Sequence, residues 1–178
     1  MSLDYKYSTI LKVALPMMFS GFIQSIVLIT DASFISRYST ASFDAVGNAG
    51  LIYITLYMLI VGISDGAQIV MARRIGENKH NMLSGVFSAG IIFQLFFAGL
   101  LFLFMFFLIP DWIKAYALNQ QIADLQGDFI GIRSIAIFPA CIFLMMQAYF
   151  LAKGKTFPVL LSAILTALLN IVLDYGLI

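Results

Sequence analysis

Two carboxylates and one amide stand inside apolar stretches, where a charged group is costly. Asp31 lies in a run from Ile10 to Ile35, and Asn170 and Asp174 lie four residues apart in a run from Phe157 to Ile178. A central aspartate costs roughly 2.5–3.5 kcal/mol on membrane-insertion scales, so acids in such runs are functional candidates by default. Two nearby carboxylates in a low-dielectric medium cannot both ionise easily, so one of them can load and release a proton near neutral pH. The same oxygens can instead hold Na⁺.

The depth of these residues along their predicted helices brings them to one level. Asp31 comes about 21 residues after the start of its run and Asp174 about 17 after the start of its own, at ~1.5 Å per residue. Asn170 lies one turn before Asp174 on the same helical face, and Gln24 lies two turns before Asp31. If these faces meet, they form one polar pocket for H⁺ or Na⁺, with Gln24 as a supporting residue. The alternative is that each acid reaches water at a helix end.

The elements that must position these residues are membrane-spanning helices. The chain is 62% apolar and 11% charged, with a mean hydropathy of +0.99. Its apolar runs are long and continuous, which excludes a β-barrel, and each has the length of about 20 residues that crosses a bilayer as a helix. The sequence therefore predicts an all-α integral membrane protein, a bundle of about five transmembrane helices. The expected helices cover residues 10–35, 46–71, 82–109, 129–151 and 157–178.

Basic residues are unevenly divided between the two ends of the predicted bundle. One end carries seven basic residues: Lys6, Lys12, Arg73, Arg74, Lys79, Lys153 and Lys155. The other end carries three: Arg37, Lys114 and Arg133. Because cytoplasmic loops hold the excess of lysine and arginine, we expect a multi-pass protein in contact with the lipid bilayer and with its N-terminus in the cytoplasm.

The composition also excludes several classes of function. The net charge of +1 and the absence of basic runs argue against a nucleic-acid partner. His80 and Cys141 are each the only residue of their type, so a zinc site built from these ligands is excluded. The sequence has no phosphate-binding loop and no nucleophile elbow, so we expect no enzyme activity and no cofactor.

Other polar and small residues have local interpretations. Trp112, Ile113 and Tyr116 follow helical spacing between Pro110 and Asp128, which fits a short amphipathic helix, although a plain loop fits equally.

Asp65 is expected to pair with Arg73 or to face solvent. Gln68, Gln94 and Gln147 either line a cavity or form bonds between helices. The small residues of the pairs Gly62–Gly66 and Gly127–Gly131 favour close helix packing.

Four stretches, taken in order, resemble the N-terminal lobe of a MATE (multidrug and toxic compound extrusion) transporter. They are "ILKVALPMMFSGFIQSIVLITDASFISR", "GISDGAQIVMARRIGENK", "AYFLAKGKTFP" and "LNIVLDYGLI". The resemblance implies a twelve-helix transporter of two lobes, of which residues 1–178 supply part of the first. The chain then looks like a fragment whose C-terminal lobe is missing.

The resemblance also implies a function and a site. It implies an antiporter that exports organic, often cationic and amphipathic, compounds from a bacterial inner membrane in exchange for H⁺ or Na⁺. Asp31, Asn170 and Asp174 would form the cation site, with Gln24 in support. Leu28 and Val27 stand where many relatives carry Asn and Tyr, so the pocket is drier and favours H⁺.

Two alternatives to multidrug antiport stay open. One is a lipid-linked oligosaccharide flippase of the same superfamily, which needs basic residues in its cavity. Only Arg133 lies near a span, at the outer edge of the fourth predicted helix, which argues against a flippase. The other is an inert truncated membrane fragment.

Overall fold

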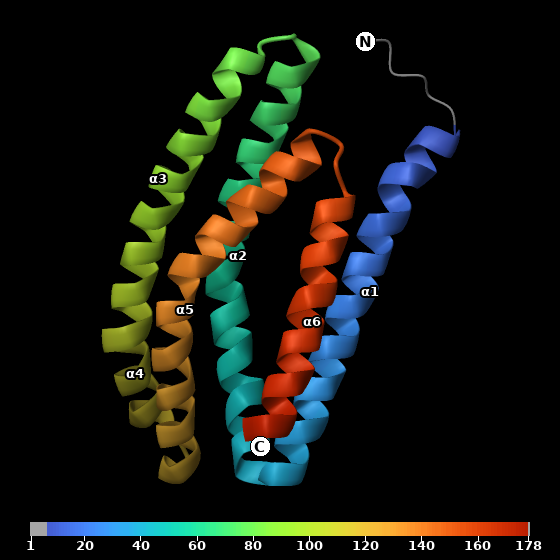
Figure 1. Ribbon diagram of the computed structural model, residues 1–178. Helices are drawn as coiled ribbons and strands as arrows, with labels where there is room; N and C mark the ends of the chain where they lie inside the picture. Colours follow the sequence, from blue (N-terminus) through green and yellow to red (C-terminus); the bar gives the residue numbers. More distant parts are fainter. Residues whose placement is uncertain (1–6, 178) are drawn as a thin grey trace.

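The computed structural model describes residues 7–177 and is helical almost throughout (Figure 1). Residues 1–6 and 178, which include Lys6 and Ile178, lie outside the described residues. The described chain has five helical segments long and apolar enough to cross a membrane, which confirms the predicted fold class. The elements are α1 (Tyr7–Tyr38), α2 (Thr40–Gly76), a 3₁₀ turn (His80–Met82), α3 (Leu83–Leu103), a π-helical segment (Phe104–Leu108), α4 (Ile109–Tyr116), α5 (Gln120–Ala152) and α6 (Phe157–Leu177).

Most of the helices extend beyond the apolar runs of the sequence, because residues at their ends cap them outside those runs. The ranges predicted from the sequence therefore lie inside longer helices. The Ser39 hydroxyl accepts a hydrogen bond from the Ser42 amide at 3.2 Å and starts α2 only one residue after α1. Asn119 accepts bonds from the amides of Gln121 and Ile122 in the same way and starts α5 nine residues before the expected position of 129. At the end of α5, Gly154 has a φ of +67°, a left-handed conformation that costs glycine little.

A π-helical segment joins α3 to α4 immediately before a proline. Pro110 has no amide hydrogen, so the carbonyl four residues earlier loses its α-helical donor, and the wider turn at Phe104–Leu108 lets the helix continue. The connection from Pro110 to Asp128 is therefore mostly helical, and Trp112, Ile113 and Tyr116 lie on α4. A β-carbon added at Gly127 of α5 would touch Pro110 at 3.4 Å, so α4 packs closely on α5 there.

The helices form a packed block and a separate pair. Three apolar clusters run along the block, and every fully buried member comes from α2, α5 or the segment from α3 to α4. α1 instead runs beside α6, and no Cα atom of α1 lies within 8 Å of one in α5. The pair joins the block mainly through the α1–α2 and α5–α6 connections (Figure 1).

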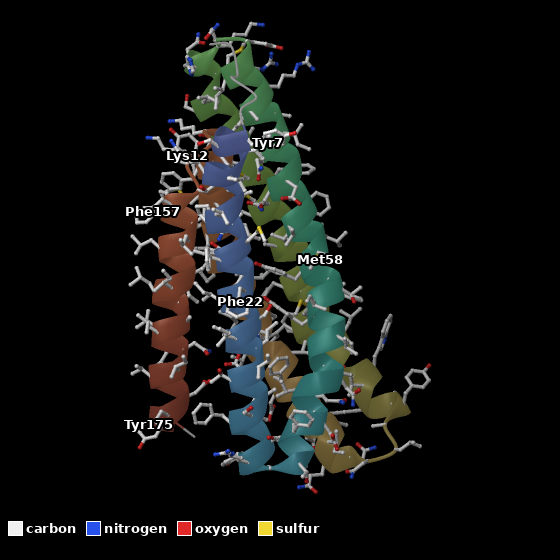
Figure 2. All side chains as sticks on the ribbon, turned by 90° about the vertical axis from the view of Figure 1, so that its right-hand side faces the viewer. Tyr7, Lys12, Phe22, Met58, Phe157 and Tyr175 are labelled. Atoms are coloured by element: carbon white, nitrogen blue, oxygen red, sulfur yellow. The ribbon has the colours of Figure 1, made fainter. Side chains whose placement is uncertain are left out.

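The outer surface is apolar along the length of the spans. Figure 2 looks onto α1 and α6 and shows Phe22, Met58 and Phe157 on this surface, where they are 64%, 53% and 67% exposed. Only 6% of the most apolar window of α1 is buried within the chain. Lipid or further protein must cover such a surface.

Candidate functional site

The seam between α1 and α6 holds the acids that the sequence singles out. Both helices run in the same direction (Figure 1), so Asp31 and Asp174 reach the same level near the α1–α2 connection. The Asp31 carboxylate lies in polar contact with the side chains of Asp174 and Asn170. The structure therefore brings these three predicted site residues together.

One side-chain oxygen of each residue in this cluster lacks a donor. In the described residues, four buried side-chain oxygen or nitrogen atoms have no hydrogen-bond partner, and three of them are Asp31 Oδ1, Asn170 Oδ1 and Asp174 Oδ2. An unpaired buried acceptor costs roughly 1–3 kcal/mol. A proton or a metal cation can satisfy buried acceptors on these three neighbouring side chains.

Gln24 is placed differently from the other predicted site residues. Its side chain is exposed, and it forms no hydrogen bond within the described residues. Because α1 and α6 run in parallel, the position seven residues before Asp174 is Ala167, which offers no polar group to Gln24. Its supporting role stays a prediction.

A basic side chain faces the cluster from the packed block. The Arg133 guanidinium carbon lies 5.3 Å from the centroid of the Tyr53 ring and 5.4 Å from that of Phe129, in cation–π geometry. Its positive charge acts weakly on the Asp31 carboxylate, less than the Asp174 and Asn170 side chains do. Arg133 also lies well inside α5, because the Asn119 cap starts that helix early. The sequence could have indicated this position, because a basic residue in an apolar run is unusual. The expected helix start at residue 129 instead placed Arg133 near the end of the predicted helix.

A buried amide links two helices of the block. The Gln94 side chain is fully buried, and its Nε2 donates to the Ile60 carbonyl at 3.1 Å and to the Ser64 hydroxyl. Gln94 therefore forms the bond between helices that the sequence left as one of two possibilities. Asp65 on α2 is exposed, which confirms the second of its two expected environments, and Arg73 pairs with Glu77 at 2.9 Å.

Three comparisons with known proteins agree with this architecture. A family model described as MatE matches residues 16–176. The probable multidrug resistance protein NorM of Thermotoga maritima is 22% identical over 170 residues, which cover 95% of this chain and 36% of that protein.

Two solved structures have a TM-score of 0.87 and 21% identity to this chain. One is a MOP superfamily transporter from Pyrococcus furiosus with a reverse polarity of its binding pocket, and the other is an outward-facing multidrug resistance MATE family transporter. Each match covers 93% of this chain and 37% of the solved chain, so the chain spans about a third of the length of these relatives.

Proposed function

Since the chain belongs to the MatE family, we propose that it is part of the N-terminal lobe of a secondary antiporter. The complete protein exports organic, often cationic and amphipathic, compounds in exchange for H⁺ or Na⁺. The observation that carries this proposal is the cluster of donor-free oxygens on Asp31, Asn170 and Asp174. Transport rather than catalysis is the task, and a second lobe completes the substrate cavity, as in other transporters built from two repeats.

The cluster binds the coupling cation by charge and by oxygen geometry. A proton on one carboxylate donates to the other and converts two facing acceptors into a hydrogen bond. A Na⁺ ion would take oxygen from both carboxylates and from the Asn170 amide. The apolar side chains of Val27 and Leu28 one turn before Asp31 keep the surroundings dry, which favours H⁺ over Na⁺.

Arg133 adds a positive charge whose field reaches the Asp31 carboxylate. The rings of Tyr53 and Phe129 contact its guanidinium in cation–π geometry. A positive charge near the site weakens its attraction for further cations, so we propose that one monovalent cation binds there.

Coupling follows from different affinities in two conformations. Cation binding ties α1 to α6 and favours the conformation in which the three oxygens converge, whereas the export substrate favours the other. The α1–α6 pair joins the block mainly at its connections, which leaves room for one group of helices to move against the other.

The chain is a multi-pass membrane segment, and we assign its N-terminus to the cytoplasm. Lys12, Arg73, Arg74, Lys153 and Lys155 gather at the end where α1 begins and α2 meets α3. The positive-inside rule supports a cytoplasmic position for that end, and we propose that the membrane is a bacterial inner membrane.

The experiment that tests the proposal is efflux by the complete protein in inverted membrane vesicles. We expect Asp31→Asn and Asp174→Asn to abolish cation-driven efflux of a fluorescent organic cation while expression persists. The matched control is Asp65→Asn, which removes an exposed carboxylate from α2 and should leave efflux unchanged. Wild-type efflux in Asp174→Asn would refute the cation site.

A lipid-linked oligosaccharide flippase is the second candidate, and Arg133 is the observation that favours it. A guanidinium inside a span can meet a phosphate. If deletion of the complete protein removes a cell-envelope polymer without causing drug sensitivity, the flippase replaces the antiporter. If neither phenotype appears and no cation binds, the chain is an inert membrane segment.

A further inference from the structure

A cavity of about 550 Å³ opens between the start of α3 and the end of α5, away from the α1–α6 seam. Its walls combine polar and apolar side chains from these two helices and from the turn before α3: His80, Asn81, Leu83, Ser84, Phe87, Ser88, Met146, Tyr149 and Lys153. The proposed cation site uses none of these residues.

Several polar side chains of this cavity can donate hydrogen bonds. The Lys153 amine lies 4.2 Å from the centroid of the Tyr149 ring and donates to the Tyr149 hydroxyl. An ammonium group has three donors, so two of them remain for a ligand. No carboxylate lines the cavity, and the nearby Glu77 carboxylate is engaged by Arg73 at 2.9 Å and by Lys79 at 3.1 Å.

Two hydroxyls add neutral donors to the same wall. Several serines within the spans, such as Ser20 and Ser33, donate to a carbonyl of their own helix. Ser84 and Ser88 line the cavity and make no such bond in the described chain. Their hydroxyls, one turn apart on α3, are free to donate to an anion.

Apolar side chains form another part of the cavity wall. Phe87 and Tyr149 meet edge to face at 5.7 Å, and Leu83 and Met146 extend this surface. The third candidate span begins at His80 and the fourth ends at Ala152, so the cavity lies where membrane helices meet the headgroup layer. An occupant that matches both surfaces has an anionic head and an apolar body.

We propose that this cavity binds an anionic phospholipid from the surrounding leaflet. Its phosphate accepts hydrogen bonds from Lys153 and from the hydroxyls of Ser84 and Ser88. Its glycerol and upper acyl chain lie on Phe87 and Met146. Basic pockets between helices at the cytoplasmic side of a membrane hold such headgroups by the same chemistry.

Lipid retention by the complete protein tests this assignment. The protein is equilibrated with equal amounts of phosphatidylglycerol and phosphatidylcholine in detergent micelles, and retained lipid is counted by native mass spectrometry. We expect the wild type to prefer phosphatidylglycerol. Lys153→Gln should reduce that preference more than tenfold, because it removes a charge-assisted hydrogen bond as well as a charge.

The chain offers a matched control on the same turn. Lys155 is also exposed, two residues further on, and does not line the cavity. Lys155→Gln should cost no more than roughly the fivefold attraction of one lysine to an anionic surface. Ser84→Leu fills the cavity from the opposite wall without changing the charge and should reproduce the effect of Lys153→Gln.

Three results would overturn the proposal. Equal losses in Lys153→Gln and Lys155→Gln would reduce the effect to general surface attraction. Equal retention of the two lipids by the wild type would remove the charge selectivity. Displacement of phosphatidylglycerol by millimolar inorganic phosphate would make the cavity a site for the free anion.

Discussion

Replacing Asp174 with asparagine should make the thermal stability of the complete protein insensitive to the coupling cation. In the wild type, Asp31 Oδ1 and Asp174 Oδ2 are buried acceptors without a donor, on two side chains that are in polar contact. The asparagine amide puts an NH₂ group where one of these oxygens stood. It donates to Asp31 and removes one negative charge, so the cluster is paired without any cation.

The expected size of the effect follows from the unpaired atoms. One buried acceptor that gains a donor recovers about 1–3 kcal/mol, so Asp174→Asn should exceed the wild type by that amount at high pH without Na⁺. A cation at a hundred times its dissociation constant stabilises the wild type by about 2.7 kcal/mol. The two proteins should therefore converge or cross as the cation is added.

Thermal denaturation in detergent measures this difference. The melting temperature is followed from pH 9 to pH 5, with and without Na⁺, for the wild type, Asp174→Asn and the control Asp65→Asn. A native state that binds more protons than the unfolded state gains stability as the pH falls, so proton coupling gives a rise toward pH 5 and Na⁺ coupling gives a rise with salt. The reasoning fails if Asp174→Asn keeps the cation response of the wild type, or if Asp65→Asn loses it.

Three further predictions concern stability and are also measured by thermal denaturation. Gln94→Leu removes two bonds between helices, worth about 0.6 kcal/mol each, together with one unpaired buried oxygen, so the free energy of unfolding should change by less than about 2 kcal/mol; a larger loss would contradict this balance. Gly90→Val should destabilise by about 1–3 kcal/mol, because a β-carbon there would lie 2.7 Å from the Met145 methyl group, whereas Gly99→Ala enters open space and should be neutral. Lys79 and two arginines hold the pKa of Glu77 down to about 2 from an ordinary 4.5, so Glu77 stabilises the fold above pH 4.5 and loses this effect as the pH falls to about 2; Glu77→Gln should melt below the wild type at pH 7, and a difference that persists at pH 2 would refute the ion-pair explanation.

The five spans were predictable because each apolar run exceeds the bilayer thickness, but their ends were not. Polar residues from Gln120 to Asp128 continue α5 because the Asn119 cap precedes them, and the hydrophobic pattern alone does not reveal a cap that lies ahead of its run. For this reason Arg133 was expected at the membrane edge, whereas the structure places it well within α5.

The sequence predicted the common depth of Asp31 and Asp174 in the membrane. It predicted their contact only on the condition that their two helices pack together. Helical rise gave Asp31 and Asp174 the same level, whereas the pairing of α1 with α6 depends on tertiary packing that one sequence does not display. Small residues were an uneven guide to packing, since Gly127 does lie close to Pro110. Gly62 and Gly66 have no neighbour within 4 Å of an added β-carbon, while Gly90 lies beneath Met145, because a small side chain permits close packing without causing it.

The placement of Asp31 and Asp174 on α1 and α6 has a consequence for biosynthesis. About 140 residues separate the two acids along the chain. At a ribosomal rate of roughly 5–20 residues per second, Asp31 waits roughly 7–28 s for its carboxylate neighbour. Arg133 is made before Asp174, so we expect the nascent protein to shield Asp31 with arginine first and to complete the acidic pair only when α6 leaves the translocon.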